Sequence, residues 1–332
     1  MPSVLLPRTS KNIQQAMLTG LLLFMTAAQP VSAATDDVAS LLKKITSADR
    51  ELNYQGVFIM RKADRIISMR VSHAADDGRI RENLESLNGE SHRIIRDNDK
   101  YYTIHPDRKT VRISKGHVRT ELHPALPENL DKLAAYYDIE RLRDDRIADH
   151  DTAVLKLKPR DDYRYGYQYW VDADTGVLLR CDMLDQDNKA IEQMMFTQFE
   201  YKDDLPVSTF SVPGLDKMQQ RHLGDNRQQT GESGWQVAKL PAGFVLTQSS
   251  QRSKGDNHYF HLVYSDGLAS VSVFIETGKS QTHFLDGATS IGALNAYGAR
   301  IGDVFVTVMG EVPAETVETI AMSTQPTNGY ED

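Results

Sequence analysis

The sequence predicts an α+β protein that is mostly β, with a large antiparallel sheet covered by helices and a smaller α+β domain after it. Three observations lead to this prediction. Apolar residues first recur at helical spacing, and from about residue 53 they recur with a period of two over many short runs. A polar stretch at residues 206–233 then interrupts the pattern. Beyond it, further strand-like runs end in another helical segment.

The N-terminus has the features of a cleavable signal peptide, residues 1–33. Arg8 and Lys11 form its basic region, and residues 16–28 form an apolar run that is too short to span a bilayer. Small residues then precede Ala34. We therefore expect an exported, soluble chain that begins at Ala34.

Composition excludes two classes of protein. Without the two basic residues of the signal peptide, the 38 Lys+Arg fall to 36 against 46 Asp+Glu, so the net charge changes from −8 to −10. An acidic chain with no basic tract is not expected to bind nucleic acid. The single cysteine, Cys181, cannot form an internal disulfide and lies far from the cleavage point where a lipoprotein needs one. About 300 remaining residues correspond to roughly two domains.

The first domain is expected at residues 34–205. A helix is predicted at residues 35–49 from apolar side chains at i, i+3, i+4 and i+7. Strands separated by turns such as Asp77-Gly78 follow it as an antiparallel meander. A second helix is predicted at residues 127–142, with Pro127 near its first turn. The strands of this domain are expected at residues 53–62, 64–74, 78–87, 91–106, 110–114, 152–159, 163–184 and 190–202.

The second domain is expected at residues 234–325, after a linker at residues 206–233 and before a tail at residues 326–332. Its terminal helix is predicted at residues 312–323, with Pro313 at its start. Its strands are expected at residues 235–248, 258–267, 268–276, 292–301 and 303–311.

The run "YRYGYQYWVDADTGVLLRCDML", residues 163–184, is predicted to be a hairpin with one apolar face. A cysteine in such a face has a raised thiol pKa and is a poor nucleophile, so we expect Cys181 to be an inert core residue. By parity, the apolar face carries Tyr163, Tyr165, Tyr167, Tyr169, Val171, Val177, Leu179, Cys181 and Met183. The other face carries Arg164, Gln168, Trp170, Arg180 and Asp182.

Motifs that would indicate catalysis or metal binding fail on spacing. In "DADTG" the glycine, Gly176, comes one residue early for a calcium loop, and Met183 occupies the position that needs a glutamate. Ser40 to Lys43 matches S-x-x-K but has no partner motif. His258 and His261 are three apart on an expected strand and so face opposite sides. We therefore predict no catalytic residue, metal or cofactor, and a binding protein in place of an enzyme.

Several separated blocks of the sequence match one known family. In the first domain the blocks are "AAYYDIERLRDDRIADHDTAVLKLKPRDDYRYGY", "RYGYQYWVDADTGVLLRCDMLD" and "AIEQMMFTQF". In the second domain they are "LPAGF", "YSDGLASVSVFIE" and "GEVPAETVETIA". In these blocks the sequence resembles the MucB/RseB family of periplasmic regulators, and the resemblance extends over essentially the whole exported chain.

The resemblance implies a fold and a function. The large domain would be an unclosed β-barrel similar to the lipoprotein carriers LolA and LolB. The small domain would bind the periplasmic part of a membrane-anchored anti-sigma factor, shield it from site-1 proteolysis and so restrain the envelope-stress sigma factor. Lipopolysaccharide or lipoprotein acyl chains in the large domain would release this block. A homo-oligomer is left open.

Candidate site residues follow from strand parity and from the preference of interfaces for aromatic anchors. The apolar face has two interpretations: a solid core beneath the helices, or a partly hollow core that admits acyl chains, for which flexible methionines would suit. The candidate lipid-binding residues are Tyr54, Phe58, Tyr167, Tyr169, Met183 and Phe199. The candidate partner-binding residues are Trp235, Tyr259, Tyr264, Asp266 and Gly267.

Two other functions compete with regulation. A periplasmic lipid or lipoprotein carrier would use the large domain for transport and the small domain for docking. An exported hydrolase would need a nucleophile and a base, and the sequence shows no such pair.

Overall fold

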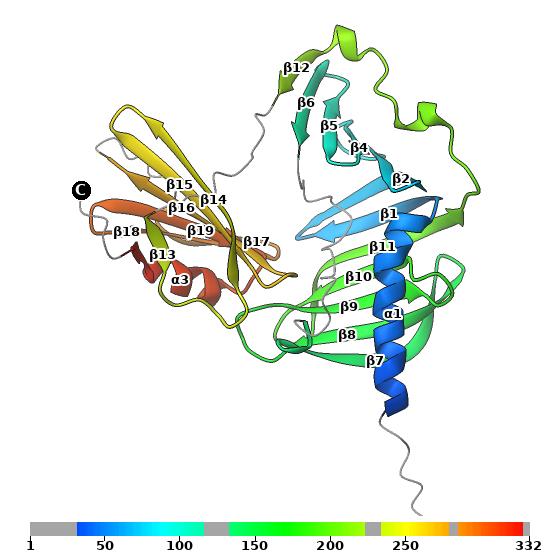
Figure 1. Ribbon diagram of the computed structural model, residues 1–332, viewed down its shortest axis with the longest axis horizontal. Coiled ribbons are helices and arrows are strands. Elements are labelled where there is room, and N and C mark those ends of the chain that lie inside the picture. The colour runs from blue at the N-terminus through cyan, green and yellow to red at the C-terminus, as the bar shows by residue number, and fades with distance from the viewer. Residues whose placement is uncertain (1–31, 116–132, 223–233, 279–284, 328–332) are drawn as a thin grey trace, which may run out of the picture.

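A computed structural model describes residues 32–115, 133–222, 234–278 and 285–327. The chain forms two sheet-based domains that lie side by side (Figure 1). A long N-terminal helix crosses the larger sheet, and a short helix packs on the smaller one (Figure 1). The α+β class with a mostly β content is confirmed.

The larger domain is one twelve-stranded sheet in the order β12-β6-β5-β4-β3-β2-β1-β11-β10-β9-β8-β7. Its neighbours are antiparallel except for β12 and β6, and its two ends are different strands, so the sheet stays unclosed as predicted. The strands are β1 (Tyr54–Lys62), β2 (Arg65–Asp76), β3 (Arg79–Ser86), β4 (Arg93–Asp97), β5 (Lys100–His105), β6 (Thr110–Lys115), β7 (Tyr137–Ile147), β8 (His150–Pro159), β9 (Gly166–Asp172), β10 (Leu178–Leu184), β11 (Ala190–Tyr201) and β12 (Gln219–His222).

Helix α1 (Ser32–Glu51) lies across this sheet (Figure 1). Leu41, Leu42 and Ala48 are buried against the sheet, in agreement with the predicted apolar face. The helix also touches the β9–β10 turn, where Gly176 has a φ of 83° and a Cβ would lie 2.6 Å from the backbone of Lys44. Only glycine fits this turn, which explains the residue without a metal.

The smaller domain has a six-stranded antiparallel sheet in the order β14-β15-β16-β19-β18-β17. Helix α3 (Ala314–Met322) begins after Pro313 and buries Val317, Ile320 and Ala321. The predicted terminal helix is therefore confirmed. The strands are β13 (Trp235–Val237), β14 (Val245–Lys254), β15 (Asn257–Ser265), β16 (Ser270–Thr277), β17 (Gly287–Ile291), β18 (Leu294–Ile301), β19 (Val304–Gly310) and β20 (Thr324–Pro326), of which β13 and β20 pair with each other.

The structure shortens the helix predicted at residues 127–142. Residues 127–132 lie outside the described residues, Leu133 and Ala134 are helical as predicted, and from Tyr137 onward the chain forms strand β7. Tyr137 and Ile139 pair with Pro159 and Leu157 of β8, so their side chains share one face of the sheet and Asp138 between them lies on the other. Pairing with β8 thus overrides a local pattern that also fits a helix.

The segment predicted as a linker is also partly built into the large domain. After two short 3-10 helices, η1 (Val207–Phe210) and η2 (Leu215–Lys217), the chain forms β12 at the edge of the large sheet. Phe210 is buried, and Val212, Leu215 and Met218 pack on the core beside β4 to β6. The sparse apolar residues of this polar stretch therefore have a packing role. The predicted signal peptide at residues 1–33 lies almost wholly outside the described residues.

Candidate functional site

A buried hydrophobic cluster, here called the inner cluster, fills the large domain beneath α1. The hairpin begins at Gly166, and within it the predicted apolar face is confirmed where β9 and β10 pair Tyr169 with Cys181 and Tyr167 with Met183. The two tyrosine rings stack with centroids 5.9 Å apart. On the opposite face the Arg180 guanidinium lies 4.0 Å from the centre of the Trp170 ring.

All six candidate lipid-binding residues lie in or against the inner cluster. Tyr54, Phe58, Tyr167, Tyr169 and Met183 are buried, and Phe199 is half-buried against them. The geometry thus places them together, with no exposed side chain among the six. The hydroxyl of Tyr169 is buried without a hydrogen-bond partner among the described residues. Lipid binding by these residues stays a prediction.

A cleft of about 350 Å³ opens between α1 and the β9–β10 turn. Its lining includes Ala48 of α1, which belongs to the inner cluster, and Leu52, which directly follows α1. The Lys44 ammonium group donates a hydrogen bond of 2.9 Å to the carbonyl of Ala173 at one side of the cleft. The lining residues are Ser40, Lys43, Lys44, Ser47, Ala48, Glu51, Leu52 and Thr175.

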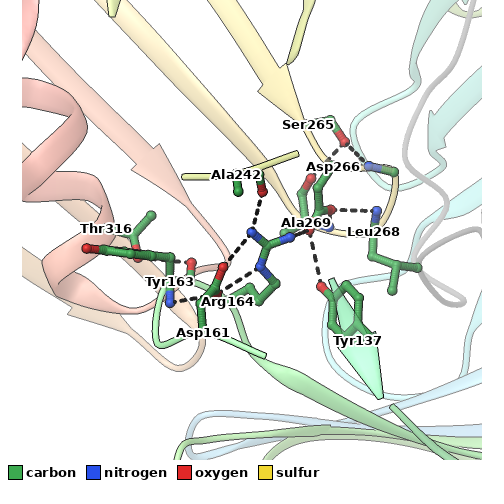
Figure 2. Close-up of polar contacts among 11 residues, drawn as sticks. Tyr137, Asp161, Tyr163, Arg164, Ala242, Ser265, Asp266, Leu268, Ala269 and Thr316 are labelled. Carbon is green, nitrogen blue, oxygen red and sulfur yellow. Dashed lines mark hydrogen bonds and ion pairs between the residues drawn. The ribbon is translucent and has the colours of Figure 1, made fainter. Parts of the chain in front are cut away.

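The two domains meet at a buried ion pair between Arg164 and Asp266 (Figure 2). Arg164 Nη1 lies 2.6 Å from Asp266 Oδ2, and both side chains are 0% exposed. Arg164 also donates to Asp161 through Nε (3.0 Å) and Nη2 (2.9 Å), and to the carbonyl of Ala242 (2.6 Å). The hydroxyl of Tyr137 donates to Asp266 Oδ2 at 3.3 Å. We call this set of contacts the domain junction.

Rings and charges stabilise the guanidinium of Arg164. Its Cζ lies 5.1 Å from the ring centre of Tyr136 and 5.2 Å from that of Phe244. Burial opposes its charge, but the hydrogen bonds that Arg164 donates to Asp161 and the charge of Asp266 outweigh burial and raise the pKa of Arg164. Burial also raises the pKa of Tyr137 far above its usual value. The arginine is therefore a permanent cation and the tyrosine a permanent donor.

The small domain also contacts the large domain through neutral groups. Asn295 donates to the hydroxyl of Tyr165 at 2.9 Å, and Thr316 of α3 donates to the carbonyl of Tyr163 at 3.0 Å. Leu268 and Ala293 of the small domain belong to the inner cluster itself. The apolar core of the large domain is thus continuous with part of the small domain.

The segment "LPAGF" of the small domain passes so close to the ring of Tyr136 in the large domain that it needs a glycine, Gly243. Gly243 has a φ of 87°, and a Cβ there would lie 2.4 Å from the ring of Tyr136. An alanine would be strained by both its backbone and the ring.

The structure places the candidate partner-binding residues differently from the prediction of exposed anchors. Asp266 is wholly buried in the domain junction, where its Oδ1 also accepts from the backbone of Leu268 and Ala269 (Figure 2). Tyr264 is a buried core residue. Trp235 and Tyr259 are half-buried, and Gly267 is exposed with a φ of 103°. The "YSDG" turn therefore faces the large domain.

The remaining motifs are explained by structure. The buried thiol of Cys181 has a pKa raised by desolvation, as predicted. Asp172 Oδ1 accepts from the backbone of Asp174 and Thr175, which makes "DADTG" a capped turn. His258 and His261 lie on β15 and bond to different serines, at 2.8 Å and 3.1 Å.

Sequence reasoning missed the central residue of the junction. Arg164 was assigned only to the polar face of the hairpin, yet it bonds a residue 102 positions away. Hydrophobic periodicity carries no information on such long-range polar pairs. The one available signal was an arginine placed between two tyrosines, two residues before β9.

The same two-domain architecture occurs in sigma-factor regulatory proteins. The sigma factor AlgU regulatory protein MucB of Pseudomonas aeruginosa is 30% identical over 328 residues, which cover 93% of this chain and 97% of that protein. The sigma-E factor regulatory protein RseB of Haemophilus influenzae is 27% identical over 307 residues, 91% of this chain and 95% of that protein.

Family profiles and a solved structure agree with these relatives. The MucB/RseB N-terminal domain matches residues 37–214, and the MucB/RseB C-terminal domain matches residues 229–325. This chain belongs to the MucB/RseB family. A solved complex of MucA and MucB from Pseudomonas aeruginosa has a chain that is 26% identical, with a TM-score of 0.72 over 88% of this chain and 100% of that chain. Within the described residues, no helix is both long and apolar enough to cross a membrane.

Proposed function

We propose that this protein works in the periplasm, where it binds the periplasmic domain of a membrane-anchored anti-sigma factor. In this role it shields that domain from site-1 proteolysis and so restrains the envelope-stress sigma factor. The observation that carries the proposal is the likeness over both domains to MucB, a protein solved in complex with MucA(peri). The protein acts by binding and has no catalytic role.

The partner surface we propose is the exposed start of β14. Val245 and Leu246 are 60% and 50% exposed, and they pair with Ser265 and Tyr264 beside the "YSDG" turn. Large apolar side chains at an exposed sheet edge are suited to a protein partner. We propose this surface instead of Asp266, the partner-binding residue expected from the sequence, because the carboxylate of Asp266 is already bonded to Arg164.

Acyl chains of lipopolysaccharide or lipoprotein release the partner in this proposal. An acyl chain in the cleft beside α1 would contact Ala48, a member of the inner cluster, and that cluster includes Leu268 and Ala293 of the small domain. A ligand shifts a conformation only by binding its states with different affinity. Acyl burial contributes about 0.8 kcal/mol per CH₂, so a few carbons match a coupling of about 1–3 kcal/mol.

Digestion of the anti-sigma periplasmic domain by its site-1 protease tests the regulatory proposal. We expect the protein to slow cleavage and Leu246→Asp to abolish most of this protection. Ile66→Asp is the matched control, because Ile66 is 64% exposed on β2 of the other domain. If the wild-type protein gives no protection, the regulatory function is wrong. If both variants protect equally, only the proposed surface is wrong.

A fluorescent fatty acid tests the acyl site independently of the partner. Ser47→Trp fills the cleft from α1 and should weaken binding at least tenfold. Ser208→Trp, at an exposed position of η1, should leave binding unchanged. If the two variants bind the fatty acid with equal affinity, the lipid binds at a site other than this cleft.

The cleft and the apolar interior also favour a second candidate function, a lipid or lipoprotein carrier. A carrier would move labelled lipoprotein between vesicles at a rate that depends on protein concentration. We expect no such transfer, and only release of the bound anti-sigma domain.

A further inference from the structure

Three elements of the large domain bring Asp49, His73 and Glu82 together. Asp49 lies in the last turn of α1, and His73 and Glu82 are opposite each other on β2 and β3. His73 Nδ1 lies 3.2 Å from Glu82 Oε1 and 3.9 Å from Asp49 Oδ1. The histidine side chain is 0% exposed and the glutamate 4%, whereas Asp49 is 45% exposed. The cluster is therefore buried but open to solvent on one side.

Hydrogen bonding determines which nitrogen of His73 carries the proton. Nε2 lies 3.0 Å from the backbone carbonyl of Asp49, which can only accept, so Nε2 is the donor. This carbonyl is in the last turn of α1, where carbonyls have no partner within the helix. In the neutral ring the lone pair is then on Nδ1, facing the carboxylate of Glu82 at hydrogen-bond distance. Two acceptors at this distance require a positive species between them.

We propose that Asp49, His73 and Glu82 bind a zinc ion. At zinc–ligand distances of about 2.0 Å, the ligands of a tetrahedral site lie about 3.3 Å apart. The separation of 3.2 Å between Nδ1 and Glu82 Oε1 meets this requirement, and all three ligand atoms lie within 4.8 Å of one another. Asp49 needs only a small movement, which its exposure allows. Nitrogen and carboxylate ligands suit zinc, and solvent supplies the fourth position.

The surroundings of the cluster match those of a metal site. The bond from Nε2 to a backbone carbonyl fixes the ring orientation, as is usual for metal-binding histidines. Arg96 donates to Glu82 Oε2 at 3.2 Å and leaves Oε1 for the metal. The ring of Tyr54 stacks on His73 with centroids 4.7 Å apart. The sequence predicted no metal because the three residues come from three separate elements.

Zinc at this position would fasten the C-terminal end of α1 to the sheet. Ala48, directly before Asp49, and Glu51, two residues after it, line the cleft beside α1. Metal occupancy would therefore resist movement of the helix that borders this cleft. The site itself does not depend on the proposed regulatory function.

Calorimetric titration with zinc chloride tests the proposal, using residues 34–332 freed of metal by a chelator. We expect one zinc per chain, bound at least tenfold more weakly by Asp49→Asn and by His73→Gln. Asp49 is half exposed, so Asp49→Asn should fold even if His73→Gln does not. His258→Gln, an exposed histidine of β15, is the matched control and should bind as the wild type does.

Nuclear magnetic resonance of the imidazole nitrogens distinguishes zinc from a proton. Zinc should shift the Nδ1 resonance of His73 and leave Nε2 protonated. Absence of zinc binding, with both nitrogens of His73 protonated, would show that a proton alone fills the gap and would overturn the proposal. Zinc binding that is unchanged in Asp49→Asn would overturn it equally.

Discussion

The inner cluster and the domain junction are both buried, yet different forces stabilise them. In the inner cluster, residues such as Phe58 and Leu155 contact many neighbours through non-directional apolar surface. In the junction, Arg164 and Asp266 depend on a few directed bonds at 2.6–3.0 Å. An apolar interior can repack around an inserted group, whereas a buried ion pair is either formed or broken.

This difference suggests where each part of a switch would lie. The inner cluster would deform when a ligand enters it. The domain junction would respond in two states, with the ion pair either formed or broken. The two regions are connected because Leu268 follows Asp266 by two residues and packs into the inner cluster. The following predictions separate the two regions, beginning with the largest effect.

Arg164→Ala should have the largest effect because it leaves Asp266 charged and buried. Removing one partner of a buried ion pair costs about 3–5 kcal/mol. The free energy of unfolding can be followed by urea titration, with Trp170 reporting the large domain and Trp235 the small one. We expect the two tryptophan transitions to separate.

The control for this experiment is Arg160→Ala. Arg160 is 53% exposed and pairs with exposed Asp138 at 2.9 Å, so its loss should cost at most about 1 kcal/mol. Equal effects of the two substitutions would show that the junction contributes no more than a surface pair.

Leu155→Ala should destabilise the large domain by about 2–5 kcal/mol, because Leu155 is fully buried on β8. The reporting signal is the unfolding transition of Trp170. We expect Leu155→Ala to bind a small apolar probe better than the wild type, since an apolar cavity stays dry. If the free energy of unfolding falls by less than about 1 kcal/mol, neighbouring side chains have moved to fill the cavity left by Leu155.

Asp172→Asn tests the polar rim of the interior through pH. Burial favours a higher pKa for Asp172, but hydrogen bonds from Thr175, with smaller ones from Tyr201 and His150, lower its pKa overall. A lowered folded-state pKa gives stability that is present above the unfolded value of about 3.9 and is lost as pH falls through the folded value.

At pH 7 we therefore expect Asp172→Asn to cost about 1–3 kcal/mol. The difference from wild type should shrink as pH falls below about 4. Thermal melts between pH 3 and pH 7 measure it. A difference that does not change with pH would assign the loss to packing.

Tyr169→Phe should have the smallest effect, below about 1 kcal/mol and of either sign. The Tyr169 hydroxyl is buried without a partner among the described residues, so its removal relieves an unpaired polar group. Urea titration of both forms measures the change. A large loss would reveal a hydrogen bond to that hydroxyl.

Local patterns were sufficient for much of the fold. Alternation along β9 and β10 predicted which side chains share a face, because the period of a strand is fixed by its geometry. The same local reasoning failed at Tyr137, whose surroundings fit a helix until β8 pairs with it. It also missed the packing of Leu215 and Met218, since isolated apolar residues in a polar stretch form no period.

The candidate site was predicted in its apolar half only. Burial of Tyr167 and Met183 follows from their own strands. The bond between Arg164 and Asp266 depends on how two domains meet, as does the burial of the predicted interface residue Asp266. Contacts between residues far apart in the sequence can be identified only once the three-dimensional structure is known.

Strand β12 sets the tether length between the domains. The chain is fastened to the large sheet as far as His222, so the covalent connection to the small domain runs from His222 to Gly234. A fully stretched chain of this length spans at most about 40 Å. A released small domain would therefore remain at a high effective concentration, on the order of millimolar, near its former position. Rebinding would be intramolecular, so opening would persist only while a ligand or partner occupied one of the separated surfaces.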